Sequence, residues 1–183
     1  LVSLINDLID YSKIVTSHNI ILKKEIFDFN ELVIAVVEKL KTMADEKKIS
    51  ISMDIDKSIL LEADKRKIGR IIFNLLHNSI KFNRDGGYVK ISATPAGSKI
   101  IIKISDSGIG IPQEKIDKIF ETFFQVDFSS KRKYDGTGLG LSIVKEYLFL
   151  HQGQYRIQKS SPAGTEFIVE LPNSLTDERL SNE

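Results

Sequence analysis

The chain of 183 residues is 42% hydrophobic and 28% charged, the composition of a globular domain that buries a core. Its 26 lysines and arginines nearly balance 25 aspartates and glutamates, and the net charge of +1 excludes the basic bias of a general nucleic-acid or membrane-surface binder. No cysteine is present, which excludes disulfides, thiol nucleophiles and cysteine-ligated metals. The longest stretch without a charged residue, between Arg70 and Lys81, is far shorter than the ~20 apolar residues of a membrane-spanning helix.

Residues 1–12 have the apolar spacing of an amphipathic helix. The apolar positions are Leu1, Leu4, Ile5, Leu8 and Ile9. No capping residue precedes them, and the chain has neither an initiator methionine nor a basic segment followed by an apolar one. We therefore expect the end of a longer helix from a bundle or dimer interface, although a first helix packed on its own domain would show the same pattern.

Capping residues and apolar periodicity predict the other elements. Asp28 and Glu31 have the spacing of a capping box and predict a helix that begins at Asp28, with Lys47 and Lys48 placed favourably at its C-terminal end. Asp64 predicts the cap of a second, long helix. The remaining expectations are, in chain order, an irregular connection over 13–27, a strand over 49–56 with one buried face, the end of the long helix near Phe82, a turn over 83–87, strands over 89–93 and 100–104 joined at 95–98, a short helix from Pro112 that carries Ile116, Ile119 and Phe120, an irregular loop over 125–135, a helix over 137–151, strands over 155–159 and 165–171, and a polar, frayed tail.

Hairpins and helices are mixed along the chain and do not alternate strictly as strand, helix, strand. This order predicts an α+β fold. We expect a two-layer sandwich in which helices cover one face of a mixed, mostly antiparallel sheet.

A polar edge lies beside the apolar face of the long helix over 64–82. At about 100° per residue, Asn74, Asn78 and Lys81 fall within about 60° of one another. Amide oxygens are hard ligands that suit Mg²⁺, which usually also binds the phosphates of a substrate. The three residues are therefore candidates for a metal and phosphate site, and the alternative is a set of ordinary solvated positions.

Two glycine-rich segments follow expected strand and loop ends. In Asp106-Ser-Gly108-Ile-Gly110-Ile111-Pro112 a carboxylate can accept a hydrogen bond from a ligand amine, while the glycines let that ligand approach the backbone; a plain Asp-Gly turn is the alternative. Gly136-Thr137-Gly138-Leu139-Gly140-Leu141 opens a helix, where N–H groups and the dipole bind anions, and the basic run Lys131-Arg132-Lys133 precedes it. The spacing fits neither a Walker A loop nor a Rossmann fingerprint.

The order of these segments closely resembles the N, G1, F and G2 boxes of the catalytic and ATP-binding domain of sensor histidine kinases. Asn74-Leu-Leu-His-Asn78-Ser-Ile-Lys81-Phe82 resembles the N box, and the 106–112 segment resembles G1. Phe120-Glu-Thr-Phe-Phe124 resembles the F box, the 136–141 segment the G2 box, and Gly164-Thr-Glu-Phe167 a last glycine motif. Residues 4–13 resemble the end of the second helix of the dimerisation and histidine-phosphotransfer domain.

The resemblance implies a Bergerat-type fold with ATP and Mg²⁺ as ligands. It implies that Asn78 and Asn74 hold Mg²⁺, that Lys81 contacts phosphate, and that these three residues serve catalysis. It also implies that Asp106 accepts a hydrogen bond from the adenine amine and that Thr165 contacts the adenine through a water molecule. The implied lid is the 112–135 loop. The implied ATP-binding residues are Asn74, Asn78, Lys81, Phe82, Asp106, Gly108, Gly110, Ile111, Phe120, Lys131, Arg132, Gly136, Thr137, Gly138, Leu139, Gly140, Leu141 and Thr165.

The resemblance also implies partners and domain limits. None of the three histidines has the His-Glu or His-Asp context of a phosphoacceptor, so we expect the acceptor helix upstream of residue 1. We expect residues 1–20 to end the phosphotransfer helix and connector, 21–172 to form the catalytic domain, and 173–183 to be a polar tail. The implied partners are the phosphotransfer hairpin of the same protein, a response-regulator receiver domain and a second copy in a homodimer. No nucleic acid is expected as a partner. The implied location is the cytoplasm, where the parent protein is either free or anchored in the cell membrane.

The interpretation as a histidine kinase has to be weighed against two departures from the family pattern and two other possible functions. His151-Gln152-Gly153 stands where the family has His-Gly-Gly, and Asp135-Gly136 stands where a glycine pair is often seen. Relatives that hydrolyse ATP or phosphorylate serine or threonine resemble one another in carrying Glu, a general base, four residues before the metal-binding Asn. Asn74 occupies that position and cannot take a proton, which favours a histidine kinase. A non-catalytic nucleotide-binding module is the third alternative.

Overall fold

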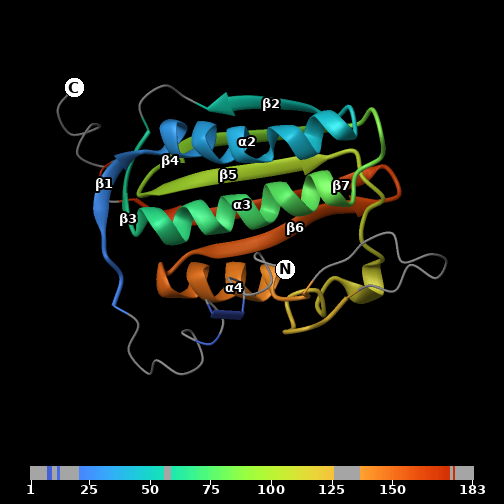
Figure 1. The fold of residues 1–183 in the computed structure, drawn as a ribbon. Helices are drawn as coiled ribbons and strands as arrows, with labels where there is room; N and C mark the ends of the chain where they lie inside the picture. The colour runs from blue at the N-terminus through green and yellow to red at the C-terminus, as the bar shows by residue number, and fades with distance from the viewer. Residues whose placement is uncertain are drawn as a thin grey trace.

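The computed structural model describes residues 8, 9, 12, 21–55, 59–125, 137–173 and 175. The elements are β1 (Glu25–Asp28), α2 (Phe29–Glu46), β2 (Ser50–Ile55), β3 (Leu60–Ala63), α3 (Lys65–Lys81), β4 (Tyr88–Ala96), β5 (Lys99–Asp106), a 3₁₀ helix (Gln113–Lys115), α4 (Gly140–Leu150), β6 (Gln154–Ser161) and β7 (Gly164–Pro172). Five strands form one sheet in the order β2-β4-β5-β7-β6. Figure 1 shows α2, α3 and α4 side by side on one face of this sheet, which confirms the predicted α+β sandwich.

The sheet is mixed, as predicted. β2 pairs in parallel with β4, whereas β4 with β5, β5 with β7 and β6 with β7 are antiparallel. The β4–β5 hairpin is tighter than the expected junction over 95–98, because Pro95 and Ala96 are still paired with Ile100 and Lys99. Gly97, with a φ of +57°, makes the two-residue turn possible.

The core lies between the sheet and the helices. Alternate residues of the central strands, including Ile91, Ile102 and Ile104, are buried against the apolar face of α3, which contributes Ile68 and Ile72. Each such side chain stabilises the fold by roughly 1.5–3 kcal/mol through removal from water. This packing fixes α3, and with it the predicted polar edge, against the end of β5.

The predicted caps of the two long helices are confirmed. Asp28 Oδ1 accepts hydrogen bonds from the backbone of Asn30 at 2.7 Å and Glu31 at 3.3 Å. Asp64 Oδ1 accepts from the backbone of Lys67 at 3.1 Å. These bonds satisfy N–H groups that have no partner within the helix, so they set where α2 and α3 begin.

Lys47 does not serve its own helix in the way we predicted. It is the C-cap residue of α2, but its ammonium donates to the carbonyl oxygens of Ile80 at 3.0 Å, Lys81 at 2.7 Å and Asn83 at 2.9 Å. The reason is the parallel packing of α2 and α3, which brings their C-terminal ends together. The charge therefore stabilises the negative end of the neighbouring helix dipole.

Two strands were not predicted from the sequence. β1 falls in the segment expected to be irregular, and β3 precedes the long helix; together they form a separate antiparallel pair with Glu25 opposite Ala63 and Asp28 opposite Leu60. Neither Glu25–Asp28 nor Leu60–Ala63 alternates strictly between apolar and polar residues, so the usual sequence signal of a strand is missing. Pairing between segments more than 30 residues apart supplies the stability that neither has alone.

Three other expectations are corrected. The segment from Pro112 forms only a 3₁₀ helix and turns, although Ile119 and Phe120 are buried as expected. α4 begins at Gly140 and not at Thr137. β2 is an edge strand without a fully buried face, since Met53 is 43% exposed.

The predicted ends of the chain are covered only in part. Of the helix expected over 1–12, residues 8, 9 and 12 are described and helical, while the loop predicted over 125–135 is described only at Gln125. Asn173 is not frayed: it is 1% exposed, and its amide side chain donates to Leu60 O at 2.9 Å. Within the described ranges, no helix is long and apolar enough to cross a membrane.

Candidate functional site

Asp106, the last residue of β5, is held by three hydrogen bonds. Its Oδ1 accepts from the backbone N–H groups of Gly108 at 2.9 Å and Thr165 at 3.2 Å, and its Oδ2 accepts from Ser79 Oγ at 3.0 Å. Burial raises the pKa of Asp106 above its ordinary value, and the bonds from Gly108, Ser79 and Thr165 oppose the rise. The carboxylate is thus fixed at the C-terminal end of the central strand β5, where Oδ2 still has a lone pair for a ligand.

Close backbone packing explains the glycines that follow Asp106. A Cβ atom at Gly108 would lie 2.7 Å from the carbonyl oxygen of Phe82, and one at Gly110 would lie 1.9 Å from that of Ser161. Gly110 also has a φ of +73°, which side chains disfavour. The predicted close approach at this loop is therefore made first by the protein's own backbone, with Ile109 N–H donating to Phe82 O at 3.1 Å.

Thr165 and Ile111 both contact Ser160 of β6. Ser160 Oγ accepts from the backbone of Ile111 at 2.7 Å and lies 3.4 Å from the hydroxyl of Thr165. The Thr165 backbone contacts Asp106 directly, which adds a contact to the water-mediated role that the family resemblance implies. Ile111, Thr165 and Asp106 are thus brought together.

The predicted polar edge of α3 faces the start of α4. Asn74 is 7% exposed, and its Nδ2 donates to the carbonyl oxygen of Gly140 at 3.1 Å. Asn78, one turn later, is half-buried, and the ammonium of Lys81 lies 4.8 Å from the ring centroid of Phe82. This edge and the glycine-rich turn over 137–140, where Leu139 N–H donates to Thr137 Oγ1 at 3.0 Å, therefore lie next to each other.

The residues at this edge fit a Mg²⁺ ion. Among the described residues no group of three or more His, Cys, Asp or Glu side chains could hold a metal. A metal here would depend on the amide oxygens of Asn78 and Asn74, and the bond from Asn74 Nδ2 to Gly140 leaves the Oδ1 atom of Asn74 as its donor. One or two protein oxygens, completed by water and phosphate, are the coordination that Mg²⁺ favours.

The aromatic segment over 120–124 packs against the core and against the glycine-rich turn over 137–140. Phe120 is buried, with its ring 4.3 Å from Tyr155 and 5.9 Å from Phe167 between centroids. The backbone N–H of Phe123 donates to Gly138 O at 3.0 Å, and a Cβ atom at Gly138 would lie 2.7 Å from the backbone of Phe123. Phe120 therefore supports the site from the core.

The structure brings two sets of predicted site residues together. Asp106, Gly108 and Thr165 meet at the end of β5, and Asn74 meets Gly140 where α3 contacts α4. The bond from Ser79 to Asp106 joins α3 to the end of β5. Leu139 is buried and Leu141 is half-buried at the start of α4. Lys131, Arg132 and Gly136 lie outside the described residues.

Sequence reasoning missed several polar residues that support the site. Ser79 lies on the buried face of α3, and its hydroxyl binds Asp106. Asn83 is 2% exposed; its Oδ1 accepts from Ser107 Oγ at 3.0 Å, and its Nδ2 donates to Tyr88 O at 2.9 Å. The available signal was a polar side chain on a buried face, which requires a partner.

Comparison with known proteins identifies the class to which this fold and site belong. Residues 63–175 match the family described as histidine kinase-, DNA gyrase B-, and HSP90-like ATPase, and the chain belongs to that family. Within it, relatives and solved structures place the chain with the ATP-binding catalytic domains of two-component sensor kinases.

Curated relatives match nearly all of this chain. A sensor-like histidine kinase of Rhizobium meliloti (strain 1021) is 34% identical over 174 residues, which cover 94% of this chain and 33% of the relative. The circadian input-output histidine kinase CikA of Synechococcus elongatus is 33% identical over 175 residues, covering 94% of this chain and 23% of CikA. The chain thus spans a third or less of the length of these two relatives.

Solved structures show the same fold. Full-length ShkA in complex with AMPPNP matches with a TM-score of 0.82 and 28% identity, covering 93% of this chain and 35% of ShkA. The nucleotide-free catalytic domain of the histidine kinase ThkA matches with a TM-score of 0.73 and 28% identity, covering 82% of this chain and 96% of that domain. ThkA in complex with the response regulator TrrA matches with a TM-score of 0.75 and 25% identity, covering 94% of this chain and 47% of that kinase chain.

Proposed function

We propose that this chain is the catalytic part of a protein-histidine kinase. The γ-phosphoryl group of ATP would pass to a histidine on a helix outside this chain and then to an aspartate of a response regulator. The observation that carries the proposal is Asn74: a neutral amide, bound to Gly140, occupies the position at which the ATP-hydrolysing and Ser/Thr-phosphorylating relatives resemble one another in carrying a general base. A site that cannot deprotonate water or a hydroxyl suits an imidazole nucleophile, which needs no base for attack.

The histidines that the structure describes support an acceptor outside this chain. His77 stacks on Phe73 with ring centroids 5.7 Å apart. His151 is 9% exposed, and both of its ring nitrogens lie within hydrogen-bond distance of backbone atoms. His18 lies outside the described residues.

In the proposed reaction the imidazole nitrogen forms a bond to the γ-phosphorus while the bond from that phosphorus to the β,γ-bridging oxygen breaks, and ADP leaves. Such a transfer asks the protein mainly for positioning and charge neutralisation. Asp106 would accept from the adenine amine, Lys81 would touch phosphate, and the N–H groups at the start of α4 would bind phosphate oxygens. Mg²⁺, held by Asn78 and Asn74, would supply further charge neutralisation.

The partners and location form part of the same proposal. The complex of ThkA with a response regulator supports a receiver domain as phosphoryl acceptor. The proposal includes a parent protein with its own phosphotransfer hairpin, working as a homodimer, because residues 4–13 resemble the end of the second helix of such a hairpin. Because the reaction consumes ATP, we place this domain in the cytoplasm, with a membrane anchor, where there is one, elsewhere in the parent.

Phosphoryl transfer in trans tests the proposal. The chain is incubated with γ-labelled ATP and Mg²⁺, with or without the separately expressed phosphotransfer hairpin of the parent protein. We expect acid-labile label on the hairpin and none on the chain, with a hairpin whose acceptor histidine is replaced by glutamine as the control. Two results would contradict a kinase that uses an external histidine. One is label on His77 or His151, and the other is release of phosphate from ATP that is as fast without the hairpin as with it.

A further inference from the structure

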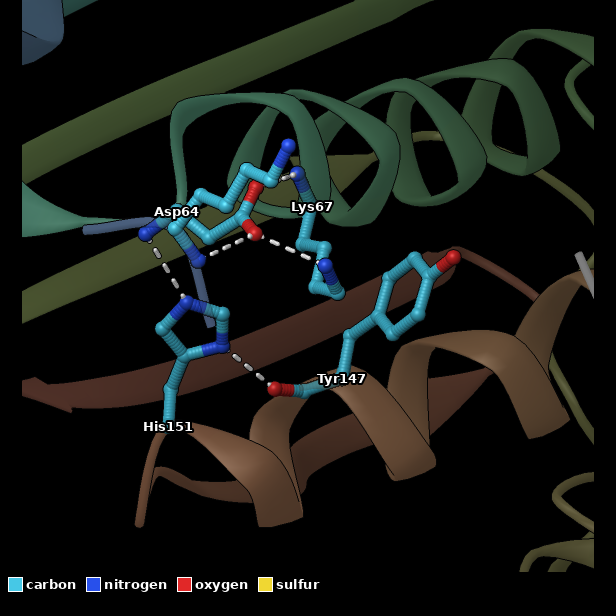
Figure 2. A network of polar contacts seen from close by, with 5 residues as sticks. Asp64, Lys67, Tyr147 and His151 are labelled. Atoms are coloured by element: carbon cyan, nitrogen blue, oxygen red, sulfur yellow. Dashed lines mark hydrogen bonds and ion pairs between the residues drawn. The ribbon is translucent and has the colours of Figure 1, made fainter. Parts of the chain in front are cut away.

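The N-terminal end of α3 and the C-terminal end of α4 meet at Asp64 and His151, as Figure 2 shows. Nδ1 of His151 lies 2.6 Å from the carbonyl oxygen of Tyr147, and because a carbonyl only accepts, Nδ1 carries the proton. Nε2 then accepts from the backbone N–H of Asp64 at 3.2 Å. Asp64 is 4% exposed, so this N–H has no water to turn to. The contact requires a neutral imidazole.

The same Asp64 binds the segment 21–24 that leads into β1. Its Oδ2 accepts from the backbone N–H of Lys23 at 3.1 Å and from the ammonium of Lys67 at 2.7 Å. Burial raises the pKa of Asp64, but the hydrogen bonds from Lys67 and Lys23 outweigh it and hold the pKa below its ordinary value. Lys23, Asp64 and His151, here called the clasp, thus join segment 21–24, α3 and α4 through one ionised carboxylate and its own backbone.

The clasp and the nucleotide site lie at opposite ends of the same two helices. Near the site, Asn74 of α3 binds Gly140 of α4; at the other end, Asp64 binds His151. At about 1.5 Å per residue, these two ties are roughly 15 Å apart along each helix. A ligand that touches both Asn78 and the start of α4 therefore fixes the relative placement of two stiff bodies that the clasp also joins.

We propose that the clasp couples segment 21–24 to the nucleotide site, so that nucleotide binding and the seating of this segment strengthen each other. The inference rests on the proposed function, because it takes ATP as the ligand that spans α3 and α4. Asp64 and His151 are then positioning residues. Coupling of this kind is reciprocal: the factor by which the nucleotide stabilises the Lys23 contact equals the factor by which that contact tightens the nucleotide.

Amide hydrogen exchange at Lys23 reports this coupling directly. The chain is isotope-labelled, and exchange is followed by NMR with and without Mg²⁺ and the β,γ-imido analogue of ATP, whose affinity is measured by calorimetry. In the wild type we expect saturating analogue to slow exchange at Lys23 on the order of fivefold. Binding without any slowing would overturn the coupling alone, whereas a wild type that does not bind the analogue would overturn the proposed function and the coupling with it.

Three variants separate the coupling from a merely structural role. Asp64→Asn leaves one side-chain oxygen to cap α3 and none to accept from Lys23. We therefore expect that the analogue no longer slows exchange at Lys23, and that its affinity falls by the coupling factor measured in the wild type. His151→Phe keeps a ring but removes the acceptor for Asp64 N–H, so the analogue should still bind without slowing exchange at Lys23. Lys67→Met, the matched control, removes the ion pair and should retain the slowing.

The outcomes of these variants decide the proposal. Wild-type slowing in both Asp64→Asn and His151→Phe would overturn it, as would an unchanged affinity in Asp64→Asn together with loss of the Lys23 contact. If His151→Phe does not fold, Asp64→Asn decides by itself, because its cap oxygen preserves the start of α3.

Discussion

Ser79 Oγ donates a 3.0 Å hydrogen bond to Asp106 Oδ2, which joins the residue after Asn78 on α3 to the end of β5. The two residues are 27 positions apart in the chain. Because Asn78 and Ser79 are adjacent, this bond sets the distance between Asn78, the expected Mg²⁺ ligand, and Asp106, the expected acceptor for the adenine amine.

Replacing Asp106 by Asn tests recognition of the adenine amine. Adenine presents an N–H donor where guanine presents a carbonyl oxygen, so the substitution should weaken ATP binding more than GTP binding. Leaving a buried polar group without its partner costs about 1–3 kcal/mol, or on the order of tenfold in affinity. Calorimetric titration of both nucleotides measures the difference, and an equal loss for both would make Asp106 a turn residue only.

Ser79→Ala should change the pH dependence of nucleotide binding. The bond from Ser79 opposes the rise that burial causes in the pKa of Asp106, so its removal raises that pKa further. An ionised Asp106 is the stronger acceptor for the adenine amine, and affinity is therefore lost as the pH falls through its pKa. We expect this loss to begin at higher pH in the variant. Affinity curves measured from neutral pH down through the acid range would coincide if Ser79 has no such effect.

Asn78→Ala tests the metal assignment. If Asn78 holds Mg²⁺, the variant should lose the Mg²⁺-dependent gain in ATP affinity and keep the affinity measured in the presence of a chelator. Lys81→Ala is the matched comparison, because it removes a phosphate contact and should weaken binding with and without metal. A full Mg²⁺ effect in Asn78→Ala would move the assignment to Asn74.

Lys47→Met tests the contribution of the ammonium at the end of α3. Methionine keeps the apolar stem but leaves three carbonyl oxygens without a charged donor, so we expect the free energy of unfolding to fall by about 2 kcal/mol. ATP affinity should fall as well, because the last turn of α3 carries Asn78 and Lys81. Lys48→Met is the control, since the Lys48 side chain is exposed, and urea unfolding measures both variants. Equal stability of the two would contradict the role of Lys47.

His151 should make stability depend on pH. Burial and, to a smaller extent, the charges of Lys67 and Lys24 lower the pKa of His151, and Tyr147 O and Asp64 oppose this. The unfolded chain therefore binds the proton more readily than the folded one, and the free energy of unfolding falls as the pH drops below the ordinary value of about 6.5. Wild type should lose more stability between pH 7.5 and 5.5 than His151→Gln does. Parallel losses in urea unfolding would show that His151 does not titrate on unfolding.

Local patterns in the sequence determined the long helices and the chemistry of the site. Asp28 and Asp64 cap α2 and α3 as their spacing predicts, because capping and helical periodicity depend on residues within one or two turns. The glycines at 108 and 110 also indicated a close approach to the backbone, although the prediction assigned that approach to a ligand and the structure shows the carbonyl oxygens of Phe82 and Ser161 there. The positions of Asn74 and Asn78 on one edge of α3 follow from helix geometry alone.

Only the tertiary structure decided which of these segments meet. The pairing of β1 with β3, the reach of Lys47 to the end of α3, the bond from Thr165 to Asp106 and the contact of Asp64 with His151 join residues between 32 and 87 positions apart. No local pattern encodes such contacts, since each depends on how the helices and the sheet pack against a shared core. The sequence determined which groups could bind a nucleotide and a metal, and packing decided which backbone and side-chain donors hold those groups in place.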